Sequence, residues 1–505
     1  MSINEKTPII VGVAQTIQRD IDPAAAKGPI DLMVDVCRAT ARDAAITDAE
    51  FSNVDSLSMV DIITGNYPDA VGLLSERLAI NPGDRHKPKA GGNTPQMLIN
   101  QAAERISLGE IKLALVTGAE TLNSLMQAGK NKVAPGWTER DNVPPQPAVG
   151  DFVGTAPYEM PYALQFPINA YPIFETAIRA NKGRSHEEHG LKIGEMFSKF
   201  TEVAAQNPNA WFPVARTAEE IATPTDHNRY VGFPYTKYMN AVIRVDQAAA
   251  VLLTSVGEAK RMGIDPAQWV YLIGCADALD HWFVSERDNF HSSPAIRVAG
   301  EQALRMAGLQ ISDIDQFDLY SCFPAAVQIG REALGIAEND PRPLTVTGGL
   351  PYHGGPANNY VSHSITTMVE RIRANPEIKG MNTALGWYVT KHAMGIYSAE
   401  PGVNTNGGWK REAPATYQAE IDALPKTEIE TTPNGEATIE SYTVMHSQAG
   451  PARAVIAGRL ENKKRFWAET PNDPDVWNEL MTTEGVGRRG KVTAGDKVNT
   501  FELKD

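Results

Sequence analysis

An internal repeat constrains the fold of this 505-residue chain more than any other feature. Residues 41–60 resemble residues 304–323 at one constant offset. The identical pairs are Arg42 and Arg305, Ala44 and Ala307, Asp55 and Asp318, and Ser58 and Ser321. At the same offset Gly91-Gly92 matches Gly354-Gly355, and further on residues 104–118 resemble residues 370–386. Two unrelated helix–strand units are the alternative explanation. Because three matches keep their order and only two copies occur, the repeat predicts two fused, similar α/β halves rather than a solenoid.

The hydrophobic pattern predicts alternating strands and helices in both halves. Short apolar runs predict strands at residues 8–14, 56–63 and 111–118, and helical periodicity covers residues 30–45 and 91–108. Residues 242–256 are expected to begin the second half. Its further strands are predicted at residues 271–275, 316–320, 382–387 and 393–398. This alternation is typical of sheets covered by helices.

A loop rich in glycine and proline stands out in the second half. Residues 345–360 read TVTGGLPYHGGPANNY and lead into a helical pattern at residues 361–373. Glycine lets the backbone approach a ligand closely, and the start of a helix offers unpaired N–H groups to an anion or an oxyanion. Tyr352 and His353 lie on this loop and can move protons. The matching turn at Gly91, Gly92 and Asn93 opens the helix predicted for residues 91–108, where Asn93 or Thr94 can cap the backbone.

These segments resemble the thiolase superfamily over about residues 8–398. The motifs that carry the resemblance are VGVAQT near the start, NAVIRVDQAAAVLLTS at residues 240–255, PAIRVAGEQALRMAGLQISDIDQFDLYSCF and the GGLPYHGGP loop. Within the superfamily the chain looks closest to sterol-carrier-protein-type thiolases and to thiolase-like proteins of type 1, which carry an extra C-terminal domain. The resemblance implies a duplicated thiolase fold, layered α-β-α-β-α, with a loop domain over the active site.

The resemblance also implies which residues stand at the catalytic positions. Thiolases use a nucleophilic cysteine at a helix start, an Asn-Glu-Ala-Phe or His-Asp-Cys-Phe loop, a Gly-His-Pro loop and a Cys-x-Gly loop. Here the nucleophile position falls on Gly92, and the second loop becomes residues 320–323, YSCF. The histidine position falls on Gly355, and the last cysteine falls near Gly386 or Trp387. Both cysteines and the activating histidine are therefore replaced.

Four residues on these loops are candidates for the chemistry. Tyr320 takes the place of the residue that positions water, and a buried phenol can donate to an oxyanion. Thiolase-fold retro-aldolases of steroid side-chain breakdown also depend on tyrosines. His353 and His392 are candidate acid/base groups, because imidazole transfers protons near neutral pH. Cys322 is the cysteine of a catalytic-loop match, but sterol-carrier-type thiolases use that cysteine in support. For each, an ordinary structural role is the alternative. Gly91, Gly92, Asn93, Tyr352, Gly354 and Gly355 are predicted to bind the substrate or the oxyanion.

The resemblance assigns residues 126–240 to a loop domain that holds coenzyme A as a co-substrate. The segment begins with a proline-rich stretch without sustained periodicity, for which a long surface excursion is the alternative. Arg179, Lys182 and Arg184 are candidate contacts of the nucleotide phosphates, since cations donate strong hydrogen bonds to phosphate. A solvated basic helix face is the competing interpretation. No metal-ligand spacing occurs, so no metal is expected.

The C-terminal region changes character. Residues 400–414 are typical of a linker, and β-rich segments follow at 438–445, 452–460, 464–469 and 491–503. They predict a small antiparallel barrel, resembling an oligosaccharide- or oligonucleotide-binding fold. The predicted domains are residues 1–125 (N-terminal half), 126–240 (loop domain), 241–400 (C-terminal half), 401–415 (linker) and 416–505 (barrel).

Composition narrows the partners. The net charge of −14 disfavours nonspecific binding to nucleic acid or anionic membranes. Three cysteines in so long a chain indicate a reducing compartment, and the apolar run at the N-terminus is too short for a signal peptide or a membrane span. We therefore expect a cytoplasmic monomer or homodimer that acts on a small molecule.

The sequence supports two classes of function. The first is an enzyme that makes or breaks a C–C bond next to a carbonyl without an acyl-cysteine. Its reaction is either retro-Claisen transfer of an acyl or acetyl group from a β-keto acid or 3-ketoacyl compound to coenzyme A, or retro-aldol cleavage of a β-hydroxyacyl-coenzyme A. The second is a non-catalytic protein that binds acyl-coenzyme A on a thiolase fold. Retained ionisable groups on the catalytic loops favour the first class, and loss of both cysteines favours the second.

Overall fold

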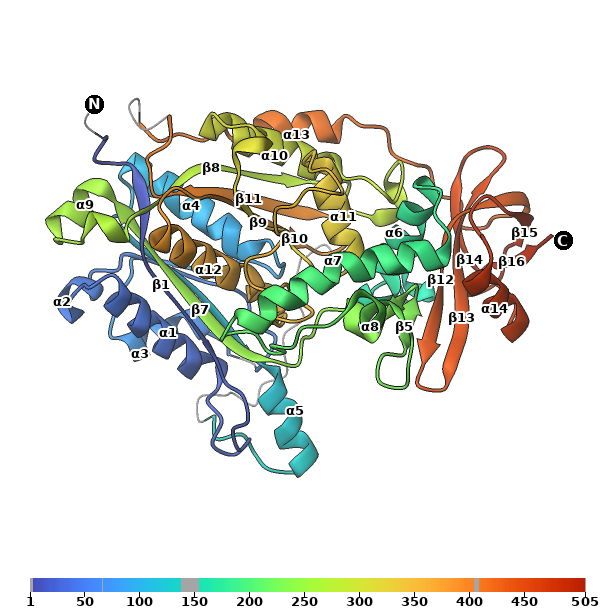
Figure 1. Cartoon of the computed structure of the whole chain (residues 1–505), viewed down its shortest axis with the longest axis horizontal. Helices are drawn as coiled ribbons and strands as arrows, with labels where there is room; N and C mark the ends of the chain where they lie inside the picture. The colour runs from blue at the N-terminus through green and yellow to red at the C-terminus, as the bar shows by residue number, and fades with distance from the viewer. Residues whose placement is uncertain (1–2, 66, 138–153, 404–407, 505) are drawn as a thin grey trace.

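The computed structural model shows a large α/β body with a β-barrel at one end (Figure 1). It describes residues 3–65, 67–137, 154–403 and 408–504. Residues 138–153 of the predicted loop domain and residues 404–407 of the predicted linker lie outside the described residues.

One nine-stranded sheet runs through the body in the order β3-β2-β4-β7-β1-β8-β11-β10-β9. Its strands are β1 (Pro8–Ile17), β2 (Ser56–Met59), β3 (Asp84–His86), β4 (Leu113–Thr121), β7 (Asp246–Ser255), β8 (Val270–Leu279), β9 (Gln316–Asp318), β10 (Lys379–Gly386) and β11 (Lys391–Ser398). The order β2-β4-β7-β1 in the first part repeats as β9-β10-β11-β8 in the second. The duplication expected from the sequence is therefore present in the strand order.

The two halves of the sheet meet at a narrow seam. β1 pairs with β8 through two residue pairs, Ile9 with Tyr271 and Ile10 with Val270. β7 pairs with β4 on one side and with β1 on the other, so its hydrogen bonds are with strands of the first half. The predicted boundary at residue 241 counts this strand with the second half instead. After the loop domain the chain re-enters the first half as β7, and the local hydrophobic pattern of a strand does not show which half it joins. The domain boundaries themselves stay predictions.

Helices form three layers around the strands. The helices of the two halves are α1 (Pro29–Asp43), α2 (Asp48–Phe51), α3 (Ala70–Leu78), α4 (Thr94–Leu108), α9 (Val256–Arg261), α10 (Pro294–Ala307), α11 (Pro324–Ala333) and α12 (Tyr360–Ala374). Figure 1 shows α4 and α12 between the strands of the two halves, with α1 and α3 on one outer side and α10 on the other. This is the predicted α-β-α-β-α layering. Because both faces of the central layer are covered, residues 360–369 of α12 are all buried, although several are polar.

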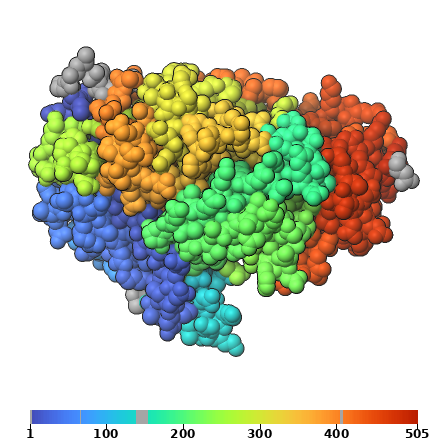
Figure 2. All heavy atoms as spheres, in the orientation of Figure 1, coloured from blue at the N-terminus to red at the C-terminus, as the bar shows by residue number. Residues whose placement is uncertain are grey.

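The chain between β4 and β7 covers one side of this body. It contains α5 (Leu122–Asn131), α6 (Pro167–Asn181), α7 (His186–Gln206), α8 (Ala218–Ala222), β5 (Tyr230–Phe233) and β6 (Tyr235–Thr236). The green surface of α7 runs across the front of the molecule and reaches toward the orange-red barrel (Figure 2). No helix in the described ranges is long and apolar enough to span a membrane.

The C-terminal region forms the predicted barrel. After α13 (Pro414–Asp422) come β12 (Gly435–Ser447), β13 (Gly450–Leu460), β14 (Arg465–Glu469), α14 (Pro474–Thr482), β15 (Arg489–Thr493) and β16 (Thr500–Leu503). The barrel closes in the order β12-β13-β14-β16-β15, with β15 pairing back to β12. One pair, Glu469 with Thr500, is parallel rather than antiparallel. β12 also pairs with β5 of the loop domain, so one strand belongs to both units.

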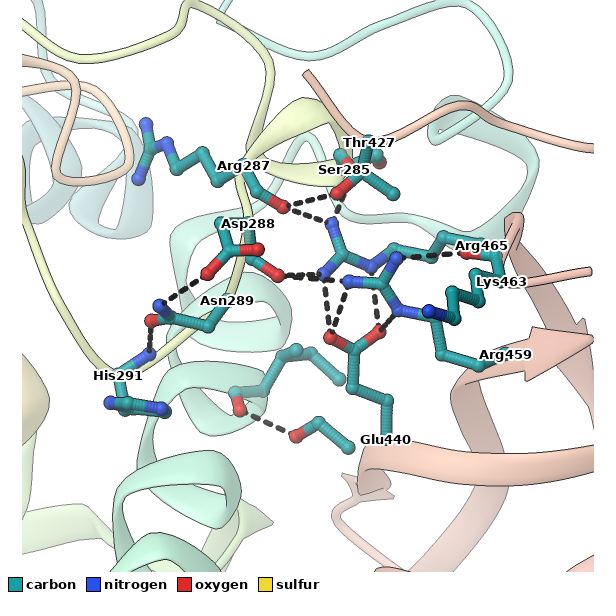
Figure 3. Close-up of polar contacts among 12 residues, drawn as sticks. Ser285, Arg287, Asp288, Asn289, His291, Thr427, Glu440, Arg459, Lys463 and Arg465 are labelled. Carbon is teal, nitrogen blue, oxygen red and sulfur yellow. Dashed lines mark hydrogen bonds and ion pairs between the residues drawn. The ribbon is translucent and has the colours of Figure 1, made fainter. Parts of the chain in front are cut away.

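A buried ion-pair cluster fixes the barrel to the body (Figure 3). The Glu440 carboxylate accepts hydrogen bonds from the guanidinium groups of Arg459 and Arg465, at 2.6–3.0 Å. Arg465 is fully buried and also donates to the backbone oxygens of Ser285, Arg287 and Asp288 in the second half. A buried guanidinium is stable only when its donors are satisfied. The barrel is therefore tied to this segment at one defined position.

Replacing Arg465 with methionine should destabilise the protein strongly. Glu440 keeps Arg459, but the backbone oxygens of the Ser285–Asp288 segment lose the donors of Arg465, and each unsatisfied buried acceptor costs about 1–3 kcal/mol of unfolding free energy. Chemical denaturation followed by tryptophan fluorescence measures the change. Arg489→Met is the matched control, because Arg489 pairs with Glu461 at the surface, where loss costs about 1 kcal/mol or less. Equal denaturation midpoints for both variants would contradict the proposed tie.

Candidate functional site

A cavity of about 250 Å³ lies where the turn at Gly91-Gly92 meets the loop after β9 and the residues just before α12. Its lining residues are Ala90, Gly91, Gly92, Pro167, Tyr171, Tyr320, Cys322, Phe323, Ala357, Asn358, Leu385 and Trp387. They come from the turn before α4, from α6, from the loop between β9 and α11, from the start of α12 and from the end of β10. The structure thus brings both repeat copies together around one space.

Tyr320 fills the place of a side chain at position 92. A Cβ atom added to Gly92 would overlap the Tyr320 hydroxyl oxygen and would lie 2.5 Å from the Leu385 carbonyl oxygen. Only glycine fits between these two oxygens, since a backbone carbonyl cannot move aside cheaply. The position that the thiolase resemblance assigns to the nucleophile is therefore closed by the phenol that the resemblance assigns to the neighbouring loop.

Asn358 fixes the glycine turn. Its Oδ1 accepts a hydrogen bond from the Gly91 N–H at 2.9 Å, and its Nδ2 donates to the Asp61 carbonyl at 2.9 Å. The Thr94 hydroxyl donates to the Gly91 carbonyl at 2.7 Å. α4 itself begins at Thr94 rather than at residue 91 as predicted.

Asn93 does not cap the helix with its side chain. Its Oδ1 is buried without a hydrogen-bond partner in the described part of the chain. A Cβ atom added to either Gly91 or Gly386 would lie 2.5 Å from this oxygen. Asn93 therefore packs between Gly91 and Gly386, and its Oδ1 can still accept a hydrogen bond beside the glycine turn.

The Tyr320 hydroxyl is a neutral donor that faces the cavity. The ring packs edge-on against Tyr360, with centroids 5.7 Å apart, and the Tyr320 N–H donates to Thr383 Oγ1 at 2.9 Å. Among the described residues none forms a hydrogen bond with its hydroxyl, which leaves the O–H available to a ligand. Burial raises the pKa of Tyr320 well above its usual value, with a smaller contribution from Cys322. The phenol therefore keeps its proton at neutral pH.

The buried carboxyl group of Asp318 holds Tyr360, the residue that packs against the ring of Tyr320. The Tyr360 hydroxyl donates to Asp318 Oδ1 at 2.9 Å, and Thr345 and the Val346 N–H donate to Oδ2. Burial raises the pKa of Asp318 to about 6, although these hydrogen bonds lower it. The network holds the strand end of β9 and the ring of Tyr360 in place under Tyr320.

Cys322 lines the cavity as a thiol. Burial raises the pKa of its thiol to about 12, so the nucleophilic thiolate is scarce at neutral pH. Tyr171 stacks on Phe323, with ring centroids 4.4 Å apart, and donates its hydroxyl to the Trp387 carbonyl at 2.9 Å. These aromatic rings form the apolar side of the cavity.

Lys391 was not predicted from the sequence and contacts the glycine turn that lines the cavity, whereas His392 points elsewhere. Both are in β11, where neighbouring side chains point to opposite faces of the sheet. The Lys391 ammonium donates to the Ala90 carbonyl at 2.6 Å and lies beside Gly91. His392 Nε2 is 3.2 Å from Asp280 Oδ2, a buried contact. Strand alternation in TKHAMG is the signal that could have identified the lysine.

His353 is fully buried next to the cavity wall and does not line the cavity. Its ring lies 5.1 Å from that of His363 and 5.9 Å from that of Tyr360. The Nε2 atoms of His353 and His363 have no hydrogen-bond partner in the described ranges. Burial lowers the pKa of His353 to about 4 and that of His363 well below its usual value. Both imidazoles are therefore neutral at pH 7, and an acid/base role for His353 stays a prediction.

The other predicted loop residues pack against the loop domain and the start of β7. Tyr352 donates its hydroxyl to the Tyr238 carbonyl at 3.0 Å, and Gly354 lies against Gln247. Neither these two residues nor Gly355 line the cavity. Their substrate-binding role stays a prediction, while Gly91 and Gly92 are at the site.

The three predicted phosphate ligands are paired with carboxylates. Arg179 is buried and binds Glu484 of the barrel region through two hydrogen bonds of 2.6 and 2.7 Å. Lys182 lies 3.2 Å from Glu332, and Arg184 binds Glu338 at 2.8 Å. Their role as phosphate contacts stays a prediction, and charge patterning could not show which acidic side chains lie opposite them.

Comparisons with known proteins agree with this geometry. A family model for the thiolase C-terminal domain matches residues 276–358, and one for the additional C-terminal domain of thiolase-like protein type 1 matches residues 416–497. The solved structure of a monomeric SCP2-thiolase-like protein type 1 from Mycobacterium smegmatis is 31% identical, covers 100% of both chains and has a TM-score of 0.86. The chain belongs to this thiolase-like family.

More distant relatives share the thiolase fold of this type 1 thiolase-like protein. An acetyl-CoA acetyltransferase from Methanocaldococcus jannaschii is 22% identical over 307 residues, which are 59% of this chain and 70% of that protein. The structure of the Ltp2-ChsH2(DUF35) aldolase is 17% identical, covers 78% of this chain and 98% of that chain, and has a TM-score of 0.57. The family expected from the motifs is thereby confirmed, together with the extra C-terminal domain.

The two neutral histidines should make the protein sensitive to acid. Because their pKa values are lower in the folded than in the unfolded protein, the unfolded chain binds more protons, and stability is lost as the pH falls from about 6.5 toward 4. His353 alone accounts for about 3 kcal/mol of that loss. His353→Gln should flatten the plot of unfolding free energy against pH in this window. Parallel plots for the variant and the wild type would contradict this.

Proposed function

We propose that this thiolase-like protein catalyses a retro-Claisen acyl transfer to coenzyme A without an acyl-cysteine intermediate. The observation that carries the proposal is the uncommitted, protonated hydroxyl of Tyr320 at the position of a side chain on residue 92. The site keeps a donor for a developing oxyanion, although the position of the nucleophile holds glycine. The nucleophile must then come from the second substrate.

The bond changes balance for a 3-ketoacyl compound or β-keto acid and coenzyme A. The sulfur of coenzyme A forms a bond with the keto carbon, and the C–C bond between that carbon and the neighbouring CH₂ group breaks. The electron pair of that bond stays on the CH₂ carbon, which receives the proton released by the thiol. The products are a new acyl-coenzyme A and the shortened acid or thioester.

Three features of the cavity fit these steps. The Tyr320 O–H donates to the keto oxygen as it gains negative charge. The Lys391 ammonium, held at the Ala90 carbonyl, adds positive charge beside the same turn. Tyr171, Phe323 and Trp387 exclude water and pack against the acyl chain. The shared thiolase fold supports the same reaction class, but fold alone is a weak warrant for activity.

Two other functions follow from specific observations. Retro-aldol cleavage of a β-hydroxyacyl-coenzyme A needs the same tyrosine as a proton-transfer group, and the aldolase among the fold relatives supports it. Non-catalytic binding of acyl-coenzyme A is supported by the closed position at Gly92 and by the buried, neutral His353. We further propose that the protein is a cytoplasmic monomer. The three unpaired cysteines favour a reducing compartment such as the cytoplasm, and the M. smegmatis relative, which is monomeric, favours a monomer.

Turnover should depend on the hydroxyl of Tyr320. The purified protein is incubated with coenzyme A and a panel of β-keto acids, 3-ketoacyl thioesters and β-hydroxyacyl thioesters, and products are followed by mass spectrometry. Tyr320→Phe should lower kcat by about 10²- to 10⁴-fold, the usual contribution of a proton donor. Tyr230→Phe is the matched control, because Tyr230 lies in β5 and does not line the cavity, and it should keep near wild-type turnover.

The same panel separates the three functions. Shorter acyl products that need free coenzyme A support the retro-Claisen reaction, whereas an aldehyde or ketone from a β-hydroxyacyl thioester supports the retro-aldol reaction. Saturable binding of acyl-coenzyme A without any product supports the binding protein. Equal turnover in Tyr320→Phe and the wild type would remove Tyr320 from the mechanism.

Replacing Cys322 with serine should leave turnover within a few-fold of the wild type. The raised pKa of the thiol makes covalent attack unfavourable, and serine keeps the volume and the donor. Intact-protein mass spectrometry after mixing with substrate measures any adduct. An acyl adduct on wild-type protein that is absent from Cys322→Ser would show that the mechanism is covalent after all.

A further inference from the structure

We propose that a second, larger cavity binds a phosphate-bearing small molecule. It has a volume of about 810 Å³ and lies between α7 and residues 331–344, the segment that begins at the end of α11. The green surface of α7 and the gold surface of this segment meet on the front face of the molecule (Figure 2). No lining residue is shared with the cavity at Tyr320, and Arg184 is the one of the three predicted coenzyme A contacts that lines this second cavity.

Arg331 is the first group that needs a ligand. It is 7% exposed, lines the cavity and forms no side-chain hydrogen bond with any described residue. Its nearest carboxylate is Glu338, at 3.9 Å, which is too long for a hydrogen bond. A guanidinium remains charged at every physiological pH and offers five N–H donors. The Arg331 nitrogens are not among the fully buried polar atoms of the described residues, so a ligand in the cavity can reach them.

Arg184 adds a second guanidinium group to the lining of the same cavity. Its Nη2 donates to both carboxylate oxygens of Glu338 at 2.8 Å. Its Nη1 is buried and has no hydrogen-bond partner within the described residues. Arg184 and Arg331 both line the cavity, and the N–H donors that reach it without a partner in the described residues are those of Arg331. Guanidinium matches the geometry of phosphate oxygens better than any other side chain.

Two of the other basic side chains of the lining already have partners. Arg342 donates hydrogen bonds to Asp340 and to two backbone carbonyls, and Lys192 pairs with Glu195. Lys199 is exposed on the rim, and no ion pair is recorded for it in the described ranges. Five basic and four acidic side chains line the cavity, so it carries net positive charge in a chain of net charge −14.

The apolar part of the lining limits the class of ligand. Met196, Phe200 and Leu344 form an apolar wall beside the guanidinium groups. A cavity of this volume accommodates a ligand of nucleotide size. Inorganic phosphate and a phosphate ester that carries a nucleoside or another apolar group both present the phosphate oxygens that guanidinium binds. The experiment below distinguishes between these two kinds of ligand.

Binding is measured by isothermal titration calorimetry with inorganic phosphate, ADP and coenzyme A as separate probes, at constant ionic strength and without an acyl substrate. We expect saturable binding to the wild-type protein by at least one probe. Arg331→Met should weaken it about ten- to hundredfold, the effect of losing charge-assisted hydrogen bonds. Lys199→Met should weaken it about two- to tenfold through lost charge. Arg305→Met is the control, because Arg305 is an exposed residue of α10 outside the cavity, and it should bind as the wild type does.

The outcomes are decisive in either direction. Binding of free phosphate identifies a phosphate ion as sufficient, and binding of ADP or coenzyme A alone identifies a nucleotide ester. The proposal is overturned if no probe binds the wild-type protein, or if Arg331→Met and Lys199→Met bind as tightly as the control. If Arg331→Met fails to fold by circular dichroism, Lys199→Met decides, since its exposed side chain can be lost without unfolding. The titration contains no reaction, so its result does not depend on whether the Tyr320 site is catalytic.

Discussion

The site depends on how closely Gly92 approaches the Tyr320 hydroxyl and the Leu385 carbonyl. No side chain fits between these oxygens, so a nucleophile on residue 92 and a tyrosine on residue 320 exclude each other. Glycine at residue 92 and tyrosine at residue 320 are therefore coupled by their packing. Asn358 holds the glycine turn from the opposite half, which links this close approach to the start of α12. The local geometry of one copy of the repeat is thus fixed by the other.

The layered body holds the turn at Gly92 and the loop at Tyr320 in fixed positions relative to each other. α4 and α12 lie between the strands of both halves, and their starts meet at the cavity (Figure 1). The barrel adds to this rigidity, because β12 pairs with β5 and Arg465 binds backbone carbonyls of the second half. Arg179 of the loop domain reaches back to Glu484. The additional domain is therefore built into the cover of the body and is not a loosely tethered module.

The sequence predicted those features that depend on local pattern or duplication. The repeat predicted two similar halves, and β-rich segments separated by turn residues predicted the barrel. Pairings distant in sequence could not be predicted: β7 returns to the first half, and Arg179 and Arg184 find carboxylates in the barrel region and after α11. His392 was favoured for its chemistry, whereas strand alternation directs Lys391 to the turn. Tyr320 was identified because its loop position and its residue type agreed.

The electrostatics of the cavity favour proton donation over nucleophilic attack. Burial keeps Tyr320 and Cys322 protonated, and His353, behind the wall, stays neutral for the same reason. The charged group identified at the turn is the Lys391 ammonium, which stabilises negative charge and disfavours further positive charge. In the proposed reaction, neutral donors stabilise an oxyanion on a bound substrate without supplying an attacking group of their own. The proposed chemistry therefore needs a second reactant that brings its own thiol, or a substrate whose own C–C bond supplies the electron pair.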